Sequence, residues 1–200
     1  IGGVGDHVLL LREQLEQSDV QTWVVTGASQ SPGRDFPHTR RLIKNWNFRS
    51  IPKLLRVVKQ IDPDIVHLHY QSGAYALNPA INLLPRFIRL CRLRAKVVTT
   101  LHDLRTPYVF PKMGRLRRML VDRIARDSHG VIIVSPEDGI KLWSTHLDLD
   151  EIKYLRSTHM SLVPVGPTIV PEEDTRDRDI WRAERGLAPS AFVVGYLGFR

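Results

Sequence analysis

Histidine and aspartate side chains follow two apolar stretches of the chain. His69 closes the stretch DIVHLH, and His102 and Asp103 follow the stretch VVTTL. Ligands of open parallel sheets bind beyond the carboxyl ends of the strands, so we expect these side chains to share one rim. An imidazole there can donate or accept a proton beside a sugar or a phosphate near pH 7. The alternatives are that His69 only ends a strand and that His102 and Asp103 form a turn.

Glycines open the chain in the stretch IGGVGDH, directly before a helical pattern. In a doubly wound sheet such a glycine turn links the first strand to the first helix, whose free N–H groups can face a phosphate. We therefore expect the first strand to lie upstream of residue 1. A tight turn without a ligand is the alternative. The spacing G-G-x-G and the absence of an acidic residue after Val25-Thr26-Gly27 disfavour a dinucleotide site.

The elements that must position these residues follow from apolar patterning. Stretches rich in Val and Ile, bounded by polar or turn residues, predict strands covered on both faces. The predicted strands span residues 20–26, 64–68, 96–101, 130–134 and 161–165. Spacings of three and four apolar residues, with Ser and Pro at the starts, predict helices between most of them. The predicted helices span residues 5–17, about 51–61, about 77–93 and 112–127, with a further helix starting at Ser135 and a short one over 178–185. An interruption of the third helix at Pro85 is left open.

Strand and helix alternate along the chain, with about thirty residues from one strand to the next. This alternation predicts an α/β fold with a Rossmann-like, mainly parallel sheet flanked by helices. The segment 29–47 fits less well, and we expect a loop and an edge strand near residues 39–43. His67 lies inside its strand, and we expect it to be a hydrogen-bonded core histidine.

Composition narrows the function classes. The formal charge of +8 and the pI near 10.0 suit anionic partners, or only a soluble basic surface. One cysteine, Cys91, excludes an internal disulfide and favours a reducing, cytoplasmic location. No stretch is long and apolar enough to cross a bilayer, and the start of the chain does not resemble a signal peptide. The other histidines have no metal-ligand spacing, so no metal site is expected.

Six motifs in order resemble family-4 retaining glycosyltransferases of the GT-B fold. They are GGVGDH, PDIVHLHY, VVTTLHD, GVIIVSPE, LVPVGPTI and GLAPSAFVVGYLGF. In that family two Rossmann-like domains face a cleft, the amino-terminal one on the acceptor side and the carboxyl-terminal one on the nucleotide-sugar side. The resemblance therefore implies transfer of a sugar, of the hexosyltransferase type, from a nucleoside-diphosphate sugar to a hydroxyl of a glycan or lipid-linked acceptor. It implies no cofactor and no metal.

The resemblance also assigns residues on the donor side of the site. Gly2 and Gly3 resemble the glycine pair that approaches the donor diphosphate, and Gly198 resembles a glycine near the donor phosphate. In the family an arginine follows that last glycine, whereas Phe199 follows it here. His102 resembles the histidine that orients the transferred sugar. We take His102 with Asp103 as the candidate catalytic residues.

On the acceptor side, His7 resembles a histidine of the first helix, and His69 and Tyr70 lie in a loop that commonly lines the acceptor pocket. The implied division is a domain over 1–167, a connector over 168–190 and the first strand of a second domain over 191–200. The chain would then be the amino-terminal half of a GT-B enzyme, without its first strand. Most donor-binding groups would lie beyond Arg200, so we expect no turnover from the chain alone.

Two other function classes remain open on the sequence. A non-catalytic sugar- or nucleotide-binding domain could keep the same fold. A nucleic-acid-binding protein would suit the charge, but the basic residues lack interleaved aromatics, so no nucleic acid is expected. Basic helices over 77–93 and 112–127 could instead lie on an anionic membrane surface, which would make the protein peripheral on the inner face of the membrane.

Overall fold

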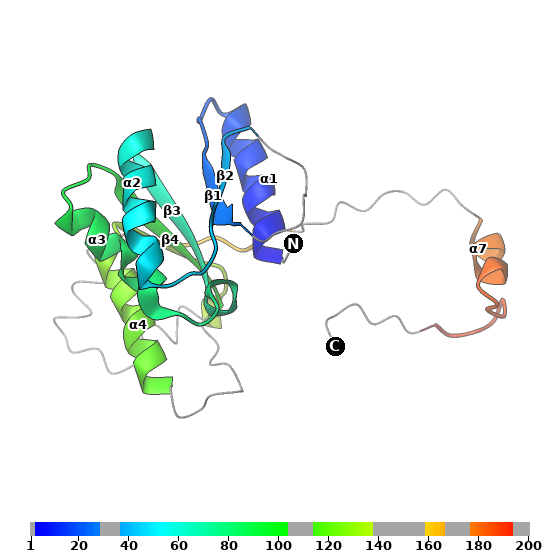
Figure 1. Ribbon diagram of the computed structural model, residues 1–200. Coiled ribbons are helices and arrows are strands. Elements are labelled where there is room, and N and C mark those ends of the chain that lie inside the picture. The colour runs from blue at the N-terminus through cyan, green and yellow to red at the C-terminus, as the bar shows by residue number, and fades with distance from the viewer. Residues whose placement is uncertain (1–2, 29–36, 104–113, 138–158, 167–176, 194–200) are drawn as a thin grey trace. The chain divides into compact units, whose positions relative to one another are not determined.

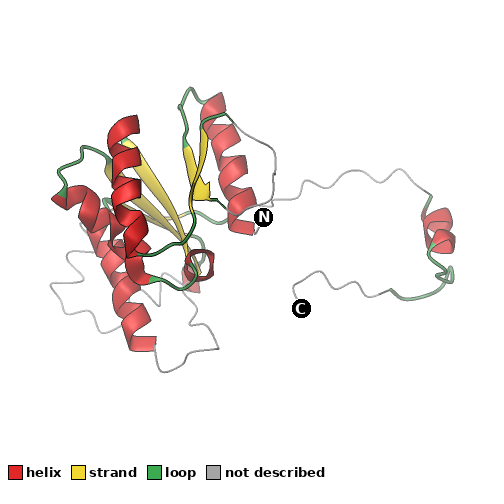
Figure 2. Ribbon diagram, viewed as in Figure 1, coloured by secondary structure: helices red, strands yellow, loops and turns green. Residues whose placement is uncertain are grey.

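The computed structural model describes residues 3–28, 37–103, 114–137, 159–166 and 177–193. The chain divides into two compact units, Ile1–Thr168 and Ile169–Arg200. The larger unit carries all the strands of the described residues (Figures 1 and 2). None of the helices in the described ranges combines the length and the apolar character that a membrane crossing requires.

The larger unit is built on parallel strands, as the sequence predicts. Its four-stranded sheet has the order β3 (Ile65–Gln71), β4 (Lys96–Asp103), β5 (Gly130–Ile133) and β6 (His159–Leu162). Every neighbouring pair in this sheet is parallel. A second parallel pair joins β1 (Val24–Gly27) to β2 (Thr39–Ile43), the predicted edge strand. The α/β fold class is therefore confirmed.

Helices connect these strands. They are α1 (Gly3–Gln17), α2 (Ile51–Ile61) after the short 3₁₀ turn η1 (Phe48–Ser50), and α4 (Gly114–Asp127). The predicted span of about 51–61 is confirmed by α2. Asp62 adopts a left-handed conformation with φ of 48°, which ends the helix. The helix predicted from Ser135 lies mostly outside the described residues.

The single helix predicted over 77–93 is wrong. This segment contains the 3₁₀ turn η3 (Pro79–Leu83) and then α3 (Leu84–Leu90), and another 3₁₀ turn, η2 (Ser72–Tyr75), precedes it. Leu77 has φ of 58°, which no helix accommodates, and the Asn78 side chain accepts a hydrogen bond from the Ala80 N–H. Pro85 lies in the first turn of α3, where its missing N–H costs nothing.

One face of the four-stranded sheet is packed against helices. Val97 and Leu101 of β4 are fully buried, as is Ile124 of α4. They join residues of α2, α3 and β3 in one apolar cluster, and Figure 1 shows these three helices grouped beside the sheet. Burial of this face provides the main stabilisation of the unit. The opposite face of β3 and β4 is therefore left to carry polar side chains.

The smaller unit contains one described helix, α7 (Arg178–Glu184), close to the predicted bounds. Asp177 caps it by accepting hydrogen bonds from the N–H groups of Asp179 and Ile180. Gly186, with φ of 65°, follows the helix end. Of the strand predicted over 191–200, the structure describes residues 191–193, which are not in a strand.

Candidate functional site

The side chains of β3 alternate between the core and the opposite face of the sheet. Leu68 and Tyr70 are buried on the core face. His67 and His69 therefore share the other face, because successive side chains of a strand point to opposite sides. The expectation that His67 is hydrogen-bonded is confirmed, because its Nε2 lies 2.7 Å from Thr100 Oγ1. The expectation that it points into the core is wrong.

His102 lies where the register of β3 and β4 changes. Tyr70 pairs with Leu101 and Gln71 pairs with Asp103, so His102 has no partner in the register. An extra residue of this kind bends a strand locally and redirects its side chains. Two positions along the strand from Thr100, His102 lies on the same face as His67 and His69.

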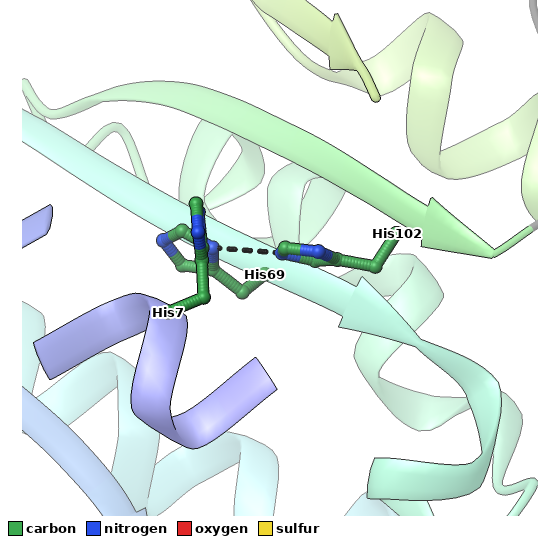
Figure 3. Close-up of side chains that lie close together, drawn as sticks. All are labelled: His7, His69 and His102. Atoms are coloured by element: carbon green, nitrogen blue, oxygen red, sulfur yellow. Dashed lines mark hydrogen bonds between the residues drawn. The ribbon is translucent and has the colours of Figure 1, made fainter. Parts of the chain in front are cut away.

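Three histidines from three elements meet on this face, as Figure 3 shows for His7 of α1, His69 of β3 and His102 of β4. The His69 Nδ1 and His102 Nε2 atoms lie 3.1 Å apart, within hydrogen-bonding distance. The His7 ring centroid lies 5.5 Å from that of His69 and 5.0 Å from that of His102, in edge-on contacts. We call these three residues the histidine cluster. The first helix therefore lies next to the carboxyl ends of β3 and β4.

Burial keeps the cluster neutral at physiological pH. Desolvation, with smaller contributions from neighbouring histidines, lowers the pKa of His69 to about 2 and that of His102 to about 4. Burial also lowers the pKa of His7, and it lowers the pKa of His67 to about 4 with a smaller contribution from His7. A neutral imidazole has one N–H donor and one lone pair, so each ring can both donate and accept.

Tyr75 holds the backbone of His69 in the histidine cluster, and sequence patterning did not identify this residue. Its hydroxyl donates a hydrogen bond of 3.0 Å to the main-chain oxygen of His69. Its ring stacks on Tyr70 at 6.1 Å and contacts Trp46 edge-on at 4.9 Å. Burial raises the pKa of the Tyr75 hydroxyl. No residue spacing indicates this contact, because η2 brings Tyr75 back beneath the strand end.

The other predicted site residues have different outcomes. Gly3 begins α1 one helical turn before His7 and is exposed, and a Cβ atom built on it meets no described atom within 4 Å. Tyr70 is buried in the core, on the face opposite His69, so the structure does not bring it to the histidine cluster. Asp103 ends β4, but its side chain lies outside the described part of the chain. Gly2 and Gly198 lie outside the described residues.

The ring nitrogens of the histidine cluster could also serve as metal ligands. One ring nitrogen from each of its three residues lies within 4.8 Å of the other two. The sequence predicted no metal site, because the three residues are separated by 62 and 33 positions along the chain. Only the fold brings them together.

A parallel α/β domain with polar groups at the strand tips defines a class of ligand-binding domain with a Rossmann-like fold. The family model of Glycosyltransferase Family 4 matches residues 1–153. The chain therefore belongs to glycosyltransferase family 4 and carries a glycosyltransferase-type domain. No curated protein matches the sequence.

Proposed function

We propose that the protein transfers a sugar from a nucleoside-diphosphate sugar to a hydroxyl of a glycan or lipid-linked acceptor, with retention at the sugar carbon. The observation that carries this proposal is the histidine cluster, which lies one helical turn from the glycine start of α1 in a family-4 domain. Family membership supplies the reaction class. The cluster supplies polar groups that suit a sugar.

Neutral imidazoles suit the recognition of sugar hydroxyls. Each ring can accept from one hydroxyl and donate to another, and burial strengthens such hydrogen bonds by excluding water. We assign His102, with Asp103, to the transferred sugar, and His7 and His69 to the acceptor side. An anionic group close to the rings would raise their pKa values, so a bound diphosphate favours a protonated His102.

The departing diphosphate gains negative charge as the glycosidic bond breaks. Backbone N–H groups at the start of a helix can stabilise such charge, and we assign this role to Gly2 and Gly3 at the start of α1. The open space at the Cβ position of Gly3, among the described atoms, supports a close approach by a ligand. Gly198 is assigned to a donor phosphate as well. In this proposal the transfer step needs neither a metal nor an organic cofactor.

A donor screen with the full-length protein tests the proposal. Several nucleotide sugars are offered with and without acceptors, and both hydrolysis and transfer are measured. His102→Ala is expected to lower kcat/KM at least tenfold, a loss of about 1.4 kcal/mol of transition-state stabilisation. His159→Ala is the matched control, because His159 is exposed on β6.

Transfer that is equal in His102→Ala and in the control would remove His102 from the chemistry. Nucleotide-sugar binding without any turnover would favour the non-catalytic binding domain. Gel-shift of nucleic acid at low micromolar protein, weakening steeply with salt, would favour the nucleic-acid alternative.

We further propose that α4 contacts an anionic membrane surface from which a lipid-linked acceptor is taken. Leu116 and Met119, one turn apart on α4, are 46% and 59% exposed. Arg89 of α3, by contrast, lies 2.7 Å from the buried Asp127 carboxylate and is partly neutralised by it. Apolar side chains on a basic helix suit the headgroup region of a bilayer.

Arg118→Glu combined with Met119→Glu is expected to reduce sedimentation with phosphatidylserine vesicles at least tenfold, because the two changes make the helix three charges more negative and each charge is worth about 1 kcal/mol near such a surface. Arg89 is left unchanged, since a glutamate there would face Asp127. Lys59→Glu, on the exposed side of α2, is the charge-reversal control. Equal sedimentation of the α4 variant and the control would contradict membrane contact through α4.

A further inference from the structure

The histidine cluster contains three ring nitrogens that could bind a metal ion, and the proposed transfer reaction does not require a metal. His7, His69 and His102 come from a helix and two strands, and each turns one ring nitrogen toward the other two (Figure 3). We propose that these three side chains form a binding site for a late first-row divalent metal ion, with zinc as the representative ion. The site uses the same three side chains that the proposed function assigns to the sugar and the acceptor, but zinc binding can be measured without a substrate.

The separation of two ring nitrogens already matches a zinc site. Zinc binds histidine nitrogen at about 2.0–2.1 Å in tetrahedral geometry, which places two ligand nitrogens about 3.3 Å apart. His69 Nδ1 and His102 Nε2 are 3.1 Å apart. A metal ion would replace the single hydrogen bond between these rings with two stronger bonds to nitrogen.

His7 supplies the third ligand by a small side-chain movement. Its ring nitrogen lies within 4.8 Å of the other two ligand nitrogens, which is longer than a tetrahedral edge. A shift of its ring on the order of 1–2 Å closes the site, within the range of side-chain rotation on a fixed helix. His7 is half-buried on α1, so its ring has room to turn.

The ligand chemistry selects the kind of ion. Within the described residues, the group of possible ligands consists of three imidazoles with no carboxylate. Magnesium and calcium prefer oxygen ligands, whereas imidazole suits zinc, cobalt, nickel and copper. Three neutral ligands leave the fourth position for water or another small ligand, as in three-histidine zinc sites.

Protons compete little with a metal ion at this site. The pKa values of His69 and His102 lie far below 7, so their lone pairs are free of protons at neutral pH. A bound ion would also hold the ring that the proposed function assigns to the transferred sugar. Zinc is therefore expected to inhibit transfer.

The test uses tag-free protein, freed of metal with a chelator and then dialysed, without any nucleotide sugar. Zinc is titrated in competition with a chromophoric chelator, and one zinc per chain with a Kd of about 10 μM or lower is expected. Cobalt(II) provides a second readout, because tetrahedral cobalt absorbs visible light far more strongly than octahedral cobalt. Magnesium at the same concentrations is expected to leave the thermal midpoint unchanged.

Three single variants locate the site. His7→Gln, His69→Asn and His102→Gln are each expected to weaken zinc binding at least tenfold and to abolish the tetrahedral cobalt spectrum, whereas His159→Ala leaves both unchanged. His7→Gln is the safest for folding, because His7 is half-exposed on a helix. Wild-type affinity in His7→Gln would overturn the three-ligand site, as would a Kd above about 100 μM for the wild type. A zinc result of either kind leaves the donor screen unaffected, so the two proposals fail separately.

Discussion

The two ends of the β3–β4–β5 strands use histidine in opposite ways. At the amino end, His129 completes the backbone pairing of β4 and β5: its N–H donates to the Val97 oxygen at 2.7 Å, and its Nδ1 accepts from the Val97 N–H at 3.0 Å. Close by, Arg94 pairs with Asp62 at 2.9 Å. At the carboxyl end, histidine rings from separate elements contact mainly one another.

At the amino end, the His129 ring stabilises the fold. At the carboxyl end, the gathered rings make protonation unfavourable and so lower stability in acid. A ring that accepts a backbone N–H satisfies a group that would otherwise be buried without a partner. Protonation of these gathered rings is unfavourable, because the added charge is desolvated and lies beside other imidazoles that can also become positive. The lowered pKa of His67 and His69 records that penalty. Folding alone does not explain such a gathering, which is typical of binding sites.

The largest expected effect is a loss of stability in mild acid. His67 and His69 have folded-state pKa values of about 4 and about 2, below the unfolded value near 6.5. Below pH 6.5 the unfolded chain therefore binds more protons than the folded chain, and the free energy of unfolding falls with pH. At pH 5.5, one unit below the unfolded value, each histidine lowers it by about 1.4 kcal/mol. Urea unfolding at pH 7.5 and 5.5, with a chelator present, is expected to show a loss of at least about 3 kcal/mol from these two residues, to which the less buried His102, with its pKa of about 4, adds a smaller amount.

His67→Asn sharpens this measurement. Without the His67 imidazole, the difference in unfolding free energy between pH 7.5 and pH 5.5 is expected to shrink by about 1.4 kcal/mol. His159→Ala, on the exposed edge strand, is expected to leave the difference close to that of the wild type. An identical acid loss in His67→Asn and the wild type would show that the carboxyl end of the strands carries no such penalty.

Much of the framework follows from local patterning alone. The stretch VVTTL predicts β4 because buried parallel strands are continuous runs rich in β-branched residues. The position of His102 at its end follows from the same run, and the common direction of parallel strands places His69 beside it. The meeting of His7 with these rings depends on how α1 packs, and only the family resemblance indicated it.

Other features depend on backbone details that residue types do not specify. The left-handed conformation at Leu77 divides the helix predicted over 77–93, although leucine rarely adopts it. The faces of His67 and Tyr70 depend on which side of β3 the helices cover, and a continuous apolar run does not indicate this. The pairing of His129 depends on the register between β4 and β5.

The smallest expected effect tests the amino end. His129→Ala removes the acceptor for the Val97 N–H, and Val97 is fully buried. A buried donor without a partner costs about 1 kcal/mol where water can take the place of the lost group, and His129 is exposed, so the free energy of unfolding from urea denaturation at pH 7.5 is expected to fall by about 1 kcal/mol. His129→Asn is expected to recover part of the loss, because an amide oxygen can accept the same hydrogen bond. Equal stability of His129→Ala and the wild type would mean that the ring does not stabilise the strands. The proposed difference between the two ends of the sheet would then be wrong for the amino end.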